Sequence, residues 1–183
     1  MRLSKLSALP FILLLFALFI SCDTEDPFSL PPPDFSTVPE PYDTSNVQAV
    51  DLSDGVKAYV HEEGYGPFEV TARDQLSIYM TLRTDEGDII YSSFSSDRTS
   101  PITISMGNAG NLQNVFDYSV LMAYTPGFKV GLLGMKVGER RTIVVPPEEG
   151  YQDLPDGHLN AEYRDNTLIY DVRISGIGPT KSQ

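Results

Sequence analysis

Hydrophobic and polar residues alternate along much of the chain after residue 55, which is the pattern of β-strands with one buried face. The clearest run covers residues 76–82, where Leu, Ile, Met and Leu alternate with Ser, Tyr and Thr. Clusters of turn-forming residues lie at 63–67 and 84–87. Shorter alternating stretches predict further strands at residues 56–60, 88–91, 102–106, 140–145 and 167–174. The pattern therefore predicts an antiparallel sheet.

One internal segment has the spacing of a short helix. Val130, Leu133 and Val137 would share one side of it, and Gly138 suits the left-handed residue that often ends a helix. A weaker helical pattern lies between residues 111 and 123. A sheet that covers one short helix is an α+β domain. We expect this domain over residues 47–178, with a short tail at residues 179–183.

The N-terminus has the character of a targeting signal. Arg2 and Lys5 precede an uncharged apolar run over residues 6–20, which is the length of a signal-peptide core and short for a membrane span. We interpret residues 1–21 as a signal peptide. Cys22, the one cysteine of the chain, follows directly after Ser21.

The sequence around that cysteine, Leu-Phe-Ile-Ser-Cys at residues 18–22, resembles the lipobox of bacterial lipoproteins. The resemblance implies cleavage before Cys22 and lipidation of its sulfur, hence a membrane anchor and an extracytoplasmic location in the cell envelope. The alternative is a secretory peptide with an incidental cysteine. Residues 22–46 are acidic and proline-rich, with no Lys or Arg, and such a composition predicts a linker rather than a packed core.

Composition excludes several classes of function. The formal net charge of −12 argues against nucleic acid, whose phosphates would be repelled. A single cysteine excludes an intrachain disulfide framework and a multi-cysteine zinc site. His61 and His158 have no second ligand at metal-binding spacing. We therefore expect no metal site and no nucleic-acid partner.

Five motifs follow one another across the predicted domain. They are Leu-Ser-Asp-Gly-Val-Lys at residues 52–57, the strand pattern at 74–81, Gly-Leu-Leu-Gly-Met-Lys-Val-Gly-Glu-Arg-Arg at 131–141, Pro-Pro-Glu-Glu-Gly-Tyr at 146–151, and Asn-Thr-Leu-Ile-Tyr-Asp-Val at 166–172. In kind and order they resemble the FKBP-type peptidyl-prolyl isomerases, and the resemblance spans about residues 52–177. It implies an antiparallel half-barrel sheet wrapped around one short helix.

The resemblance also implies a reaction, which is rotation about X-Pro peptide bonds of proline-containing polypeptides. Amide resonance sets the barrier at about 18–20 kcal/mol. Rotation requires no nucleophile, metal or cofactor, because an apolar pocket that binds the twisted amide better than the planar one lowers the barrier. A lipid-anchored member of the family would assist the folding of exported proteins.

Matching the family's pocket to this chain gives the candidate site residues. The aromatic floor, usually Trp, corresponds to Phe128, and the tyrosine that donates a hydrogen bond to the substrate carbonyl corresponds to Tyr151; we take these two as catalytic. The pocket arginine corresponds to Arg98. The remaining candidates are expected to contact substrate, and they are Ile90, Tyr91, Ile102, Tyr124, Thr125 and Tyr170.

Two positions depart from the family pattern. The pocket aspartate is replaced by Tyr91, and its tyrosine partner is replaced by Met80. Because both members of the pair are replaced, neither polar side chain is left buried without its partner. The replacement also leaves fewer oriented dipoles in the pocket. The result would be a weak isomerase, a non-catalytic module that binds peptides or proteins, or a structural component of an envelope complex. An insertion at residues 108–123 is either a lid over the pocket or a surface excursion.

Overall fold

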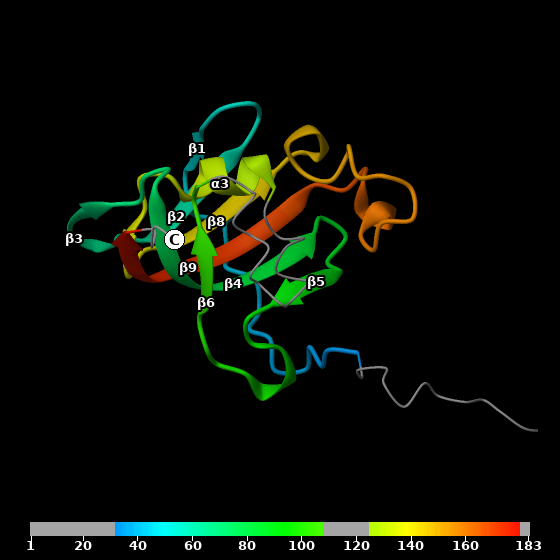
Figure 1. Ribbon diagram of the computed structural model, residues 1–183, viewed down its shortest axis with the longest axis horizontal. Coiled ribbons are helices and arrows are strands. Elements are labelled where there is room, and N and C mark those ends of the chain that lie inside the picture. Colours follow the sequence, from blue (N-terminus) through cyan, green and yellow to red (C-terminus); the bar gives the residue numbers. More distant parts are fainter. Residues whose placement is uncertain (1–31, 108–124, 180–183) are drawn as a thin grey trace, which may run out of the picture. The chain divides into compact units, whose positions relative to one another are not determined.

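A seven-stranded antiparallel sheet forms the body of the domain (Figure 1). The computed structural model describes residues 32–107 and 125–179. The sheet order is β1-β2-β8-β9-β4-β5, and β6 also pairs with β4. The strands are β1 (Ala49–Asp51), β2 (Lys57–Glu62), β4 (Asp74–Thr84), β5 (Ile89–Ser92), β6 (Ile102–Ser105), β8 (Arg140–Val145) and β9 (Leu168–Pro179).

Strands β4 and β9 form the centre of the sheet. They pair antiparallel from Asp74 opposite Pro179 to Thr84 opposite Leu168, with a bulge between Ser77 and Ile78. The alternation seen in the sequence is realised here, because the apolar side chains of both strands are buried on one face. The buried set consists of Leu76, Ile78, Met80, Leu82, Leu168, Tyr170, Val172 and Ile174.

A second, two-stranded sheet was not predicted, because its strands lie at a predicted turn and at the end of the predicted helix. Strand β3 (Tyr65–Glu69) pairs with β7 (Lys136–Val137). All of β3 is exposed, so it carries no buried alternating face by which the sequence pattern could identify it.

The single described α-helix lies earlier in the chain than predicted. Helix α3 runs over Pro126–Leu132, so the prediction that Val137 belongs to it and that Gly138 caps it is wrong. Thr125 caps its N-terminus, and Pro126 occupies the first turn, where its missing N–H costs nothing. The helix ends at Leu133, before Gly134 at φ +75°. The helical pattern between residues 111 and 123 lies outside the described residues.

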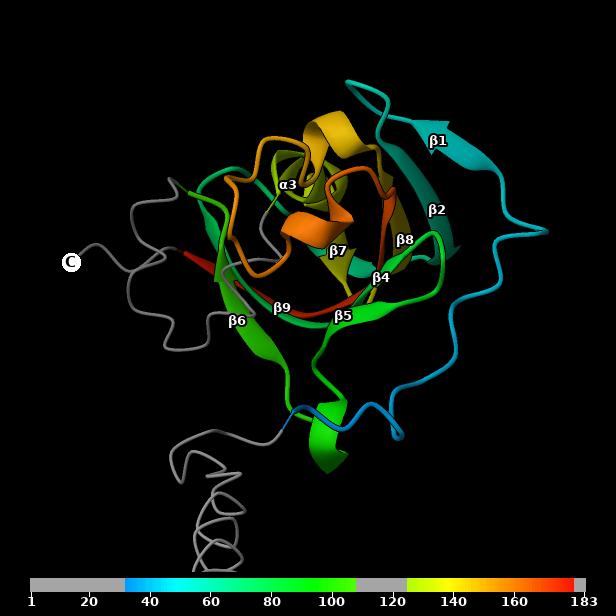
Figure 2. The same ribbon diagram turned by 90° about the vertical axis from the view of Figure 1, so that its right-hand side faces the viewer.

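Helix α3 packs inside the curve of the sheet, as Figure 2 shows. Gly127, Phe128, Gly131 and Leu132 are its buried residues. A Cβ atom on Gly131 would collide with the side chain of Ile143 on β8, so glycine is required for this close approach. The expected α+β architecture, a curved antiparallel sheet around one short helix, is confirmed.

The compact unit begins earlier than the predicted domain start at residue 47. It spans Pro33–Gln183, and we call residues 33–46 the N-terminal strap. Figure 2 shows the strap, in blue, on the outer side of the sheet, away from α3. Its composition is that of a linker, yet its side-chain and backbone groups form hydrogen bonds with the rest of the domain. Thr37 Oγ1 donates to the Phe94 carbonyl at 2.8 Å, and the Tyr42 N–H donates to Asp171 Oδ2 at 3.3 Å.

The predicted signal peptide and the lipidation residue Cys22 lie outside the described residues. None of the helices in the described ranges is long and apolar enough to cross a membrane.

Candidate active site

Two stacked aromatic rings form the centre of the candidate site. Phe128 from α3 and Tyr170 from β9 lie with ring centroids 4.3 Å apart and planes inclined by 19°. Both side chains are 0% exposed. An offset pair of this kind contributes about 0.5–1.5 kcal/mol beyond the burial of its area. The stack therefore joins the helix to the sheet with a flat apolar surface.

Thr125 ties the same two elements together through polar atoms. Its Oγ1 accepts a hydrogen bond from the Phe128 N–H at 3.2 Å, which caps α3. The same oxygen lies 3.2 Å from the Tyr170 hydroxyl. The side chain predicted to contact substrate thus has a second task, because it fixes the helix that carries Phe128 against the strand that carries Tyr170.

Tyr151 lies in the loop after the short helix η4 (Pro147–Glu149) and is 2% exposed. Burial raises its pKa, and a hydrogen bond with Asn160 lowers it in part. Burial also raises the pKa of Tyr170 well above the ordinary value, with nearby Tyr151 adding to the effect and Thr125 opposing it. Like ordinary tyrosines, both are neutral at physiological pH, and burial extends the neutral form to higher pH.

Three further predicted residues surround this centre. Tyr91, on β5 opposite Leu82, is buried in the same hydrophobic cluster as Phe128, Tyr151 and Tyr170. Ile90 and Ile102 are partly buried and pack against that cluster. Phe128, Tyr151, Tyr170, Tyr91, Ile90 and Ile102 thus belong to or pack against one buried cluster. Tyr124 lies outside the described residues.

The aromatic floor is closed to solvent. Phe128 was expected at the floor of an apolar pocket, and its ring has no exposed surface. Of the predicted substrate-contact residues that the structure describes, Ile90 and Ile102 are partly exposed.

The polar network that the family pattern implies is not formed by the matched residues. Arg98 follows the short helix η2 (Ser95–Asp97) and is exposed. Tyr91 and Met80 supply no carboxylate at the place of the family's aspartate. Within the described ranges, no three His, Cys, Asp or Glu side chains gather to hold a metal ion.

Sequence reasoning missed two buried polar contacts beside the site. Asn160, just before the short helix η5 (Ala161–Tyr163), is the partner of Tyr151 and carries no sequence signal of its own. Arg141 bonds to Glu139 and donates from Nη1 to the Gly131 carbonyl at 2.8 Å. The sequence did contain an indication of the contact between Arg141 and Glu139, because both side chains belong to the motif at residues 131–141. Arg141 thereby satisfies a carbonyl that the end of α3 leaves without a partner.

Comparison with known proteins agrees with this geometry. Residues 66–175 match the family described as FKBP-type peptidyl-prolyl cis-trans isomerase. FK506-binding protein 1A of Neurospora crassa is 26% identical over 124 residues, which cover 68% of this chain and 89% of that protein. FK506-binding protein 2B of Rhizopus delemar is 32% identical over 109 residues, covering 59% of this chain and 44% of the relative.

Solved structures share the fold. The crystal structure of FkpA from Escherichia coli has a TM-score of 0.54 at 19% identity, over 75% of this chain and 55% of that chain. At this level of identity the likeness supports the architecture alone. The match to the family covers more than half of the sequence, and the chain therefore belongs to the FKBP-type peptidyl-prolyl cis-trans isomerase family.

Proposed function

We propose that the chain catalyses cis–trans isomerisation of X-Pro peptide bonds in exported proteins, with the proline ring bound against Phe128. The observation that carries the proposal is the stack of Phe128 on Tyr170 beside the neutral Tyr151 hydroxyl. The apolar stack would favour the twisted amide, whose charge separation is smaller than that of the planar form. Every 1.4 kcal/mol of such preference accelerates rotation roughly tenfold.

Each aromatic residue has a distinct role in this proposal. The Phe128 ring supplies the surface for the pyrrolidine, and the Tyr151 O–H donates to the substrate carbonyl. Tyr170 holds the Phe128 ring flat from below and is itself held by Thr125. No proton is transferred in the reaction, and the Tyr151 phenol acts only as a hydrogen-bond donor.

One observation favours a second candidate, which is a non-catalytic module that binds proline-containing segments. Phe128 has no exposed surface, and Tyr91 stands where the family has a pocket carboxylate. A site with a buried aromatic floor and few dipoles directed at the substrate amide would bind a peptide without accelerating rotation. Turnover, rather than binding, separates the two candidates.

The cellular part of the proposal rests on the N-terminal sequence. The apolar run at residues 6–20 and Cys22 support export and lipid anchoring in the cell envelope. Metabolic labelling with a fatty acid tests this, because Cys22→Ser must abolish incorporation. Incorporation into the variant equal to that of wild type would refute the anchor.

The catalytic proposal is tested with proline tetrapeptides and the unit that begins at Pro33. We expect faster cis–trans relaxation with the wild-type protein and a loss of most of the acceleration in Phe128→Leu. Phe68→Leu is the matched control, because it makes the same change at a side chain that is 75% exposed. Equal rates for the Phe128 variant and wild type would refute the assignment of Phe128.

A further inference from the structure

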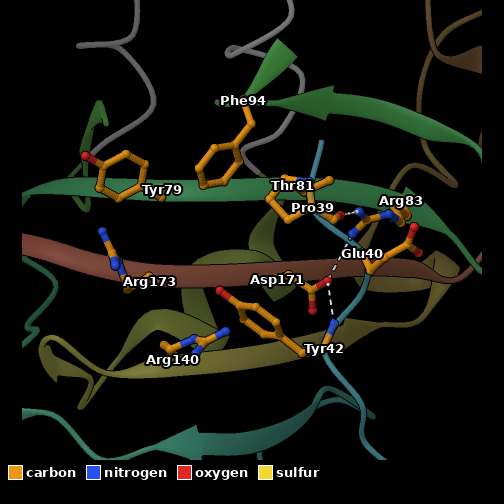
Figure 3. A pocket seen from close by; sticks show the side chains of 10 residues that line it. All are labelled: Pro39, Glu40, Tyr42, Tyr79, Thr81, Arg83, Phe94, Arg140, Asp171 and Arg173. Carbon is orange, nitrogen blue, oxygen red and sulfur yellow. Dashed lines mark hydrogen bonds and ion pairs between the residues drawn. The ribbon is translucent and has the colours of Figure 1, made fainter. Parts of the chain in front are cut away.

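A cavity of about 260 Å³ lies on the outer face of the sheet, between the N-terminal strap and strands β4, β8 and β9 (Figure 3). It is separate from the candidate active site, which lies on the opposite face. Its lining comes from the strap, the three strands and the segment after β5, and consists of Pro39, Glu40, Tyr42, Tyr79, Thr81, Arg83, Phe94, Arg140, Asp171 and Arg173.

The carboxylate at the base of the cavity, Asp171, is paired within the protein. Arg83 Nη1 donates to Asp171 Oδ2 at 3.0 Å, and the two side chains are 7% and 6% exposed. Thr142 Oγ1 donates to the other oxygen, Oδ1, at 2.6 Å. Both oxygens of Asp171 therefore accept hydrogen bonds from the protein, and its charge is balanced by Arg83.

Two other arginines of the cavity lie directly opposite each other on neighbouring strands. Arg140 on β8 is the cross-strand partner of Arg173 on β9. This pairing places two positive charges next to each other, which is destabilising unless other groups compensate. The Arg140 guanidinium lies over the Tyr42 ring, 4.5 Å from its centroid, and that of Arg173 lies 4.7 Å from the centroid of Tyr79. Each guanidinium is thus held by an aromatic ring.

The charges that remain favour an anion. Arg140 has one carboxylate partner, the exposed Glu62 at 3.7 Å. In residues 32–107 and 125–179, Arg173 forms no ion pair. Three arginines against two carboxylates leave the lining with one net positive charge, in a chain whose net charge is −12. Figure 3 shows the second carboxylate, Glu40, at the end of the cavity away from Arg140 and Arg173.

Beside these arginines the cavity offers aromatic surface. The rings of Tyr79 and Phe94 stack with centroids 5.6 Å apart, and Figure 3 shows both above the two arginines. A ligand that carries an anionic group on a flat apolar body would match both features. Arginine is suited to this because its planar fork fits a carboxylate and it has already been oriented by stacking.

We propose that this cavity is a second binding site, which takes a carboxylate next to an aromatic side chain in a polypeptide. Arg173 is its principal donor, with Arg140 beside it, and Tyr79 and Phe94 contact the aromatic body. The proposal does not depend on isomerase activity, because the site is on the other face of β4 and β9.

The probe is N-acetylphenylalanine, added to the full chain, with N-acetylphenylalaninamide as the neutral control. We expect NMR shifts of the Arg173 and Arg140 Nε–Hε resonances with the acid and none with the amide. Arg173→Gln should weaken binding of the acid about tenfold. Arg73→Gln removes the same charge from an exposed position outside the cavity lining and should leave the affinity unchanged.

Four outcomes overturn the proposal. They are equal binding of acid and amide, equal loss in the two arginine variants, binding of inorganic phosphate as tight as that of the acid, and shifts confined to residues outside the cavity.

A peptide ending in Phe with a free carboxylate and an amidated peptide with an internal Phe-Asp pair then identify the source of the carboxylate. Tighter binding of either one supports the site and names its ligand. Isomerase rates of Arg173→Gln should equal those of wild type, so failure here leaves the catalytic proposal intact.

Discussion

The hydroxyl of Tyr170 lies 3.2 Å from Oγ1 of Thr125, the residue that caps the helix carrying Phe128. One oxygen atom of Thr125 thus serves both the helix and the strand. The contact fixes the height of α3 over the sheet and, with it, the position of the aromatic stack. The Tyr170 hydroxyl therefore has a structural role, because it connects β9 to the cap of α3.

Removing that hydroxyl should have a small and specific effect. Tyr170→Phe deletes one neutral hydrogen bond but keeps the ring stack and the helix cap, so we expect a loss of about 0.5–1.5 kcal/mol in the free energy of unfolding. Thr125→Val also removes the cap and should lose about 1 kcal/mol more. Urea denaturation measures both. A larger loss in Tyr170→Phe than in Thr125→Val would contradict the role given to Thr125.

The close approach of α3 to the sheet predicts intolerance at Gly131. Gly131→Ala places a methyl group against Ile143 and should lower the free energy of unfolding by about 1–3 kcal/mol. Ile143→Ala removes all three Ile143 atoms that the methyl would meet, so Gly131→Ala should cost less in an Ile143→Ala background than in wild type. Thermal unfolding of wild type, the two single variants and the double variant measures this difference. An equal cost of Gly131→Ala in both backgrounds would show that the contact is not the cause.

The buried pair beneath the N-terminal strap predicts a large loss of stability. Asp171→Asn leaves the Arg83 guanidinium buried without its counter-charge and should cost about 3–5 kcal/mol. Asp156→Asn is the control, because Asp156 is 99% exposed in its pair with Arg164 and should cost less than about 1 kcal/mol. Chemical denaturation of both variants provides the comparison. Equal losses would mean that the strap and its buried pair contribute little.

His61 predicts a pH dependence of stability. Burial lowers its pKa, Asp171 and Asp43 oppose the shift, and Arg140 adds to it. The Thr142 hydroxyl donates its hydrogen bond to Asp171, so its oxygen accepts one from His61 Nε2, 2.9 Å away. The unfolded chain binds a proton at about pH 6.5 and the folded chain only at lower pH, so stability falls as the pH drops below that value.

His61→Gln keeps a donor but cannot be protonated. Its stability should therefore fall less than that of wild type between pH 7 and pH 5, as measured by urea denaturation at each pH. The same pH dependence in the variant and in wild type would assign the effect to other groups.

The two central strands could be predicted because each buries one face against the same core. Leu76 to Leu82 and Leu168 to Ile174 alternate in the sequence and are buried in the structure. The helix was misplaced because Val130, Leu133 and Val137 have helical spacing, while the caps at Thr125 and Gly134 decide where it lies. Capping is a local hydrogen-bond effect that the hydrophobic period does not report.

The N-terminal strap and the outer cavity could not be predicted from composition. Proline-rich acidic segments form no core of their own, but this one uses the sheet's buried Asp171 and the Phe94 carbonyl as partners. The candidate site was predicted better, because the motifs name Phe128, Tyr151 and Tyr170, which cluster in space. The closure of the Phe128 ring depends on packing across the whole pocket and has no sequence signature.

The most direct test of the catalytic claim is NMR exchange spectroscopy of a short X-Pro peptide with substoichiometric protein. Exchange peaks between the cis and trans proline resonances should appear with the wild-type protein. In Tyr151→Phe they should weaken roughly tenfold, the effect of losing one hydrogen bond to the reacting amide. Peptide signals that broaden on binding but show no cis–trans exchange would contradict the account and identify a binding module instead.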